Sequence, residues 1–164
     1  HYQKALALEP DHPDTLNNLG NALKRQWHMQ RALDCYARAI EISPAYTNAR
    51  INLAAAFIQQ RQYQAAIKHL DRVLENDPEN AEAHVNAGAA LARMNRIDQA
   101  IAHFRKALEI HPDIAETHNN LGVLLIQKRD FKAARSHFKA ALQLRPGYKS
   151  AIQNLEKLRR MRGR

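Results

Sequence analysis

The sequence is poor in several features, and each shortage excludes a class of protein. Its single cysteine, Cys35, excludes an internal disulfide framework. No run of about 20 apolar residues, as a membrane-spanning helix needs, is present. The chain has only five glycines and no low-complexity stretch. With 45% apolar and 25% charged residues, it has the composition of an ordinary folded protein.

Three residue types return with a period of 34 positions. The prolines are Pro10, Pro44, Pro78, Pro112 and Pro146. The alanines are Ala32, Ala66, Ala100 and Ala134, and the asparagines are Asn18, Asn52, Asn86, Asn120 and Asn154. A strict period of this length predicts stacked copies of one supersecondary unit rather than a globule with one central core.

Each period predicts two helices. Apolar and small residues at three-and-four spacing favour one helix over Asp14 to Gln26 and a second over Gln30 to Ile42, with a break near Trp27 and His28. Pro44 then ends the second helix, because proline lacks an amide donor and disfavours helical geometry in the residue before it.

Small and large residues alternate at the expected contact between the two helices. The small ones on the first helices are Gly20, Ala54, Gly88 and Gly122, and the alanine series lies on the second helices. The large ones are Tyr36, Leu70, Phe104 and Phe138, while Met29, Tyr63, Ile97 and Phe131 are expected to close the turns. We expect the small residues to allow close helix packing and the large ones to fill the core. Cys35, beside Tyr36 in a helix, is expected to be a buried or half-buried thiol.

These positions resemble the tetratricopeptide repeat family. Its 34-residue pattern is matched by Gly20, Ala32, Tyr36, Ala39 and Pro44, and the last full period matches equally well. The resemblance implies an all-α fold: a right-handed α-solenoid, or superhelix, of antiparallel helix pairs. The tryptophan frequent at the fourth position of the family is replaced by Leu16, Arg50, His84 and His118.

The period divides the chain into six segments. They are 1–12, the second helix of a truncated upstream repeat; 13–46, 47–80, 81–114 and 115–148, repeats 1 to 4; and 149–164, a C-terminal capping helix. We expect the 1–12 segment to expose Tyr2, Leu6 and Leu8, an apolar patch suited to end-to-end self-association. The capping helix continues the first-helix pattern through Ile152, Leu155 and Leu158, and this inner face is expected to cover the last repeat while the outer face meets water. Glu156 replaces the small residue that a partner helix requires.

The net charge of +9 is concentrated at one end. Residues 145–164 contribute +6 of it. A cationic segment can attract nucleic acid or an anionic membrane surface. Because no aromatic residue is interleaved with the basic groups from Lys149 onward to stack on bases, we favour a solvated helix and do not expect nucleic-acid binding.

The asparagine series is the main candidate for binding. In the family the corresponding face of the first helices is concave, and the series resembles the asparagine ladder of the O-GlcNAc transferase repeats. An amide side chain offers a donor and an acceptor together, so a column of them can hold a peptide backbone. The candidate peptide-binding residues are Asn18, Asn52, Asn86, Asn120, Asn154, Asn17, Asn21, Ile51, Ile58, Val85 and Arg93. The alternative is structural: each asparagine bridges its helix to a backbone group of the neighbouring repeat.

Histidines also recur, at His69, His103 and His137 on second helices and at His84 and His118 on first helices. Two ligands of one metal must both lie about 2 Å from it, so equivalent histidines of adjacent repeats are too far apart. We therefore predict no metal site. A mixed pair, such as His84 with a histidine of the preceding repeat, stays open.

No paired carboxylates, nucleophile-and-base pattern or glycine-rich phosphate loop is present. We therefore predict a non-catalytic scaffold that binds a protein or peptide ligand, without cofactor or small-molecule substrate. The alternatives are the repeat arm of a larger enzyme, such as a glycosyltransferase, and an anionic-surface binder acting through the basic C-terminal helix. The compartment stays open, with the cytoplasm as the working expectation.

Overall fold

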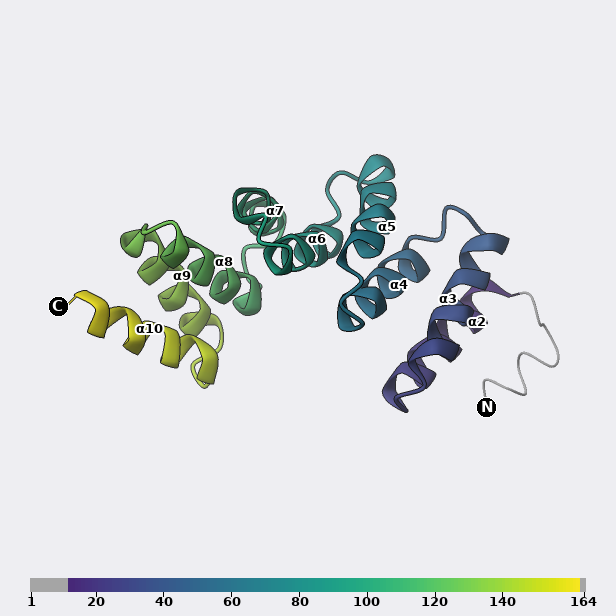
Figure 1. The fold of residues 1–164 in the computed structure, drawn as a ribbon, viewed down its shortest axis with the longest axis horizontal. Coiled ribbons are helices and arrows are strands. Elements are labelled where there is room, and N and C mark those ends of the chain that lie inside the picture. Colours follow the sequence, from purple (N-terminus) through teal and green to yellow (C-terminus); the bar gives the residue numbers. More distant parts are fainter. Residues whose placement is uncertain (1–11, 163–164) are drawn as a thin grey trace. The chain divides into compact units, whose positions relative to one another are not determined.

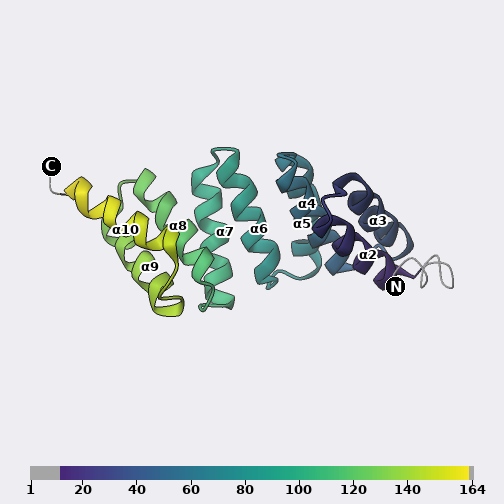
Figure 2. The same cartoon turned by 90° about the horizontal axis from the view of Figure 1, so that it is seen from below.

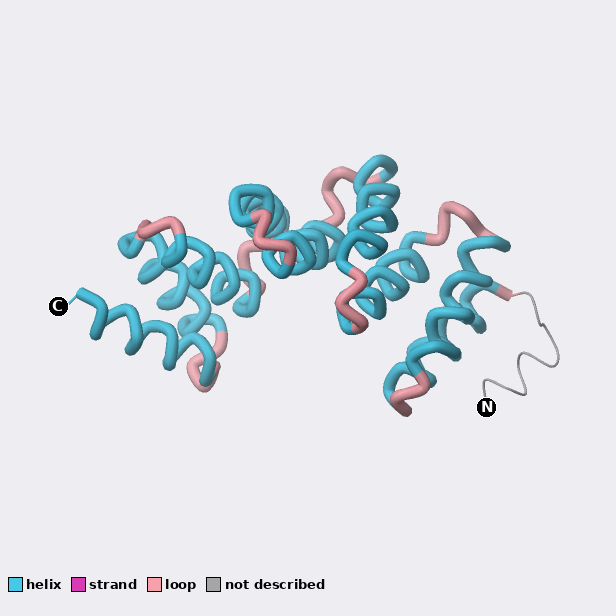
Figure 3. Tube along the Cα trace, viewed as in Figure 1, coloured by secondary structure: helices cyan, strands magenta, loops and turns pink. Residues whose placement is uncertain are grey.

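A computed structural model of the protein describes residues 12–162. These residues contain helices and connecting loops but no strand (Figure 3). The helices are α2 (Pro13–Arg25), α3 (Met29–Ile42), α4 (Thr47–Gln59), α5 (Tyr63–Asn76), α6 (Ala81–Arg93), α7 (Ile97–Ile110), α8 (Ala115–Gln127), α9 (Phe131–Leu144) and α10 (Lys149–Arg162), labelled in Figure 1. The all-α class predicted from the period is confirmed.

The chain forms two compact units, His1–Pro78 and Glu79–Arg164. In the first unit, α2 packs on α3 and α4 on α5, and α3 also contacts α4. In the second unit, α6 packs on α7 and α8 on α9, and α10 covers α9 and α8 (Figure 2). Within each unit, consecutive first helices also touch: α2 with α4, α6 with α8, and α8 with α10. Each unit is therefore a stack of helix pairs, as the repeat predicts.

The expected small-to-large contact holds each helix pair together. A Cβ atom on Gly122 would lie 2.6 Å from Cε1 of Phe138, and one on Gly20 would lie 2.5 Å from Cε1 of Tyr36. Both distances are far below van der Waals contact, so the aromatic ring occupies the space that glycine leaves. The four large residues are at most 1% exposed, and the alanines of the second helices are completely buried.

The first helices of the four repeats, α2, α4, α6 and α8, end in the same backbone motif. Trp27, Arg61, Asn95 and Arg129 have φ between 59° and 64°, the left-handed region that usually favours glycine. The residue after each donates its amide to the carbonyl five residues earlier, as His28 does to Leu23 at 2.9 Å. This bonding defines the Schellman motif, which satisfies carbonyls left over at a helix end. The predicted break near Trp27 is this motif.

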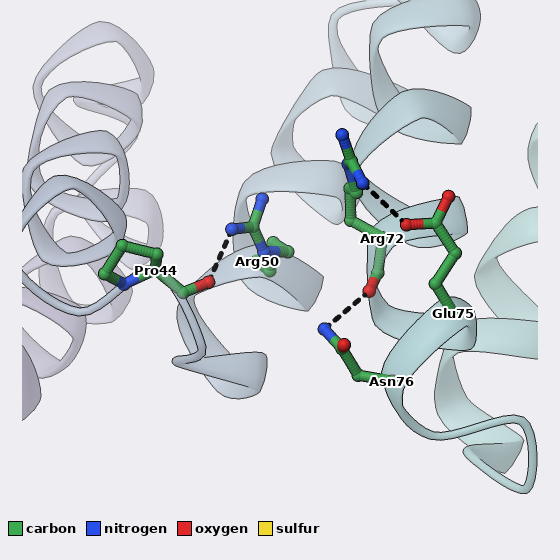
Figure 4. Close-up of polar contacts among 5 residues, drawn as sticks. All are labelled: Pro44, Arg50, Arg72, Glu75 and Asn76. Carbon is green, nitrogen blue, oxygen red and sulfur yellow. Dashed lines mark hydrogen bonds and ion pairs between the residues drawn. The ribbon is translucent and has the colours of Figure 1, made fainter.

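The fourth position of the repeat links its helix to the proline of the preceding repeat. Arg50 donates to the carbonyl oxygen of Pro44 at 2.5 Å (Figure 4). His118 Nε2 lies 2.9 Å from the carbonyl oxygen of Pro112, in the same relative position. Nearby, Arg72 forms an exposed ion pair with Glu75 at 2.8 Å, also drawn in Figure 4. A polar side chain at the fourth position of a repeat, as at Arg50 and His118, therefore connects a first helix to the loop before it.

The C-terminal helix differs from its expectation at one residue. Ala151, Leu155 and Leu158 are buried, and Glu156 is exposed. Ile152, which was expected on the inner face, is 38% exposed, so that expectation is wrong. The equivalent Leu16 is buried in a cluster with Ala39 of the following helix, and the described residues contain no helix after α10.

Two further sequence expectations concern the N-terminal segment and membrane-spanning helices. The proposed helix over residues 1–12, with its apolar patch and end-to-end association, lies outside the described residues apart from His12. Within residues 12–162, none of the helices combines the length and apolar character needed to cross a bilayer.

Candidate functional site

The asparagine ladder occupies one face of the first helices. Asn18 is exposed, whereas Asn52, Asn86, Asn120 and Asn154 are partly exposed. All five therefore present some side-chain surface. In one unit α2 contacts α4, and in the other α8 contacts both α6 and α10. The ladder residues of neighbouring repeats therefore lie on adjacent helices within each unit.

Two ladder asparagines are fixed by a second asparagine of the preceding repeat. Asn52 donates its amide to Oδ1 of Asn17 at 2.9 Å, and Asn154 donates to Oδ1 of Asn119 at 2.9 Å. Asn17 and Asn119 are each only 6% exposed. The bridge thus joins side chains of adjacent repeats, where the structural alternative had expected a backbone partner. It uses one amide hydrogen and leaves the carbonyl oxygens of Asn52 and Asn154 as acceptors.

Asn21 is held by a buried tyrosine. The Tyr36 hydroxyl donates to Oδ1 of Asn21 at 2.8 Å. Burial raises the pKa of Tyr36 to about 12, with a further contribution from Cys35, so the hydroxyl stays a neutral donor. The same buried ring that fills the space beside Gly20 therefore orients a candidate binding residue.

A surface hollow of about 410 Å³ lies along α2. It is lined by Asn18, Asn21, Lys24 and Arg25. Sequence reasoning had selected the two asparagines but missed the two cations. Lys24 and Arg25 follow Asn21 by three and four residues on one helix, and this spacing indicates that the three side chains are neighbours on the helix surface.

The remaining candidates divide by exposure. Ile51 is 4% exposed and Asn17 is 6% exposed. Both therefore pack against neighbouring residues and have little surface with which to contact a ligand. Ile58 and Val85 are partly exposed and give the face an apolar character, and Arg93 is exposed at the end of α6. Cys35 is half-buried, as expected, and burial raises the pKa of its thiol.

The histidines form close pairs that the sequence interpretation did not identify. His84 Nδ1 lies 2.9 Å from His103 Nδ1, and His118 Nδ1 lies 2.9 Å from His137 Nδ1. Each pair joins the two helices of one repeat, whereas the open alternative had paired His84 with the preceding repeat. The signal was a separation of 19 residues that occurs in two successive repeats. Burial lowers the pKa of His137, as do His118 and Arg105, while Asp130 opposes the shift.

Known structures share this fold. MamA from Desulfovibrio magneticus RS-1 (residues 41 to the end) is 24% identical, with a TM-score of 0.78, over 90% of this chain and 83% of that one. YrrB, described as a TPR protein with an unusual peptide-binding site, is 20% identical, with a TM-score of 0.79, over 99% and 84%. Pseudomonas aeruginosa pilF is 23% identical, with a TM-score of 0.82, over 89% and 67%. Among curated proteins, none matches the sequence.

Family models match most of the chain. One tetratricopeptide repeat model covers residues 13–46, the first predicted repeat. A second covers 51–113 and 86–149. The matches agree with the 34-residue period, the buried small and large positions and the helix pairs described above. The chain belongs to the tetratricopeptide repeat family.

Proposed function

We propose that this protein is a non-catalytic scaffold that binds an extended segment of a partner protein along the faces of its first helices. The observation that carries the proposal is the amide side chain at one position of every first helix, which is exposed at Asn18 and partly exposed at the other four positions. Amides spaced one per repeat can each pair with a peptide group of a bound extended chain, at intervals of about three residues and whatever its side chains. The YrrB likeness supports the proposal, because that TPR protein is described as having a peptide-binding site.

The hollow on α2 suggests the chemistry of one part of the ligand. Lys24 and Arg25 line it together with Asn18 and Asn21, and no acidic side chain does. Two cations beside two amide groups suit a carboxylate, which accepts hydrogen bonds from all four side chains. We infer that the partner segment carries an acidic group where it meets α2.

The test uses a random peptide library displayed on phage, selected on the full chain. The affected variant is Asn18→Ala with Asn86→Ala, because neither residue takes part in the buried bridge that Asn52 makes. The matched control is Gln64→Ala with Gln143→Ala, which removes two exposed amides from second helices. Selected peptides should bind the ladder variant at least about fivefold more weakly than wild type, a loss of about 1 kcal/mol in binding free energy. Their affinity for the control variant should be unchanged. Equal affinity for both variants would contradict the proposal.

A second candidate function rests on α10. Its Lys149, Lys157, Arg159 and Arg160 are all exposed, with Glu156 as the acidic residue among them. Such a surface attracts anionic partners through a salt-dependent interaction. Replacing Lys157, Arg159 and Arg160 by glutamate should abolish binding to anionic vesicles or to single-stranded DNA. If the wild-type chain binds neither at low salt, this candidate is excluded.

A further inference from the structure

The most defined polar arrangement outside the ladder is the pair formed by His118 on α8 and His137 on α9. The two Nδ1 atoms face each other at 2.9 Å. His118 Nε2 is 2.9 Å from the carbonyl oxygen of Pro112. A carbonyl oxygen only accepts hydrogen bonds, so the hydrogen of the neutral His118 ring is on Nε2. Nδ1 of His118 therefore carries a lone pair, which is directed at His137.

The close approach of two Nδ1 atoms occurs twice. His84 on α6 and His103 on α7 also have their Nδ1 atoms 2.9 Å apart. The ring centroids are 5.1 Å apart in this pair and 5.2 Å in the other. In repeats 1 and 2 the corresponding residues are Leu16 with Cys35 and Arg50 with His69, so the paired imidazoles belong to the Glu79–Arg164 unit.

We propose that each histidine pair is a bidentate site for a divalent transition-metal ion, with Cu²⁺ and Ni²⁺ preferred to Zn²⁺. Imidazole is a ligand suited to these ions. Metal–nitrogen bonds of about 2.0–2.1 Å to two nitrogens 2.9 Å apart subtend about 90° at the metal. That is the angle between adjacent ligands in the square-planar or tetragonal sites of Cu²⁺ and Ni²⁺. A tetrahedral Zn²⁺ site would require the nitrogens to be about 3.3–3.4 Å apart.

Binding requires only local changes. In the metal-free pair, Nδ1 of His137 donates to Nδ1 of His118, so this hydrogen must move to Nε2 of His137. Both rings then tilt until their lone pairs meet at the ion. His118 already has the outer hydrogen bond typical of metal-bound histidine, since its other ring nitrogen donates to a backbone carbonyl.

The remaining coordination positions fall to water. The described residues contain no group of three or more histidine, cysteine or acidic side chains able to hold one ion. The charges around His137 are mixed, with Arg105 opposing a cation and Asp130 favouring it. A bound ion would connect α8 to α9, or α6 to α7, and so stabilise the folded repeat.

The experiment titrates the full chain with Cu²⁺ by isothermal titration calorimetry, with glycine as a competitor that removes the ion from single exposed histidines. Wild type should take up two ions. His118→Gln should take up one, and His84→Gln with His118→Gln should take up none. His111→Gln, which removes an exposed histidine outside both pairs, is the matched control and should retain two.

Two measurements do not depend on the variants. Electron paramagnetic resonance of the Cu²⁺-loaded wild-type chain should show hyperfine coupling to two nitrogens at each ion, and Ni²⁺ should raise the melting temperature more than equimolar Zn²⁺. The metal site is overturned if the wild-type chain retains no ion against glycine, or if the spectrum shows one coupled nitrogen. A larger shift with Zn²⁺ would overturn the preference for Cu²⁺ and Ni²⁺.

Discussion

Asn52 is hydrogen-bonded to Asn17 of the preceding repeat at 2.9 Å, and Asn17 is almost fully buried. Replacing Asn52 by alanine should therefore destabilise the fold by about 1–2 kcal/mol, because a buried amide oxygen loses its donor. Asn18→Ala, at the equivalent exposed position, should stay within about 0.5 kcal/mol of wild type. Urea unfolding followed by circular dichroism measures both. Equal effects of the two substitutions would mean that the bridge is energetically unimportant.

Gly122→Ala should destabilise by about 1–3 kcal/mol, because its Cβ would overlap the ring of Phe138. Gly147 is the matched control: a Cβ there meets nothing within 4 Å, and its φ is not positive. Gly147→Ala should be neutral or slightly stabilising, since alanine restricts the unfolded chain. Comparing the unfolding free energies of the two variants tests the close contact, and a neutral Gly122→Ala would refute it.

Arg129→Gly should stabilise the protein by about 0.5–1 kcal/mol, because Arg129 holds a left-handed conformation that costs other residues free energy. Glycine removes the free-energy cost of the left-handed conformation, but part of this gain is lost because glycine has more conformational entropy in the unfolded chain. Asn95→Gly should gain less, since asparagine tolerates the left-handed region better than arginine does. The thermal unfolding midpoints of the two variants should differ in that order; the reverse order contradicts the strain.

His69 makes stability depend on pH. Its pKa is lowered from 6.5, first by burial and then by Arg50 and Lys68. As pH falls through 6.5, the unfolded state gains a proton that the folded state resists, so stability decreases. His69→Gln should show a smaller loss than wild type between about pH 7.5 and about pH 5.5. Urea unfolding midpoints at the two pH values measure the loss of stability for each protein. If the loss is the same in wild type and in His69→Gln, other titrating groups dominate the pH dependence.

Much of the architecture could be predicted from residues that pack by size. Gly20 and Tyr36 recur at fixed positions because one leaves the space that the other fills, and such complementarity is visible in a periodic sequence. Ile152 was misplaced because periodicity assigns a face to a residue without showing whether another helix covers that face. The left-handed turn residues were also missed, because Trp27 and Arg129 give no local signal for a conformation that glycine usually adopts.

The candidate site was only partly predictable. The asparagine positions could be found from their period, but their partners depend on contacts between adjacent repeats, as with Asn17 and Asn52. The histidine pairs depend on the two helices of one repeat bringing residues 19 positions apart into contact. Such contacts require side-chain directions as well as spacing.

The turn after α2 has a practical consequence for spectroscopy. Trp27 is the only tryptophan of the chain and is 88% exposed in that turn. Its fluorescence should change little when the distant core melts, so emission is a poor unfolding probe. The same exposure makes Trp27 a natural reporter of contact: a partner that covers this turn should shift its emission to shorter wavelength without any added label.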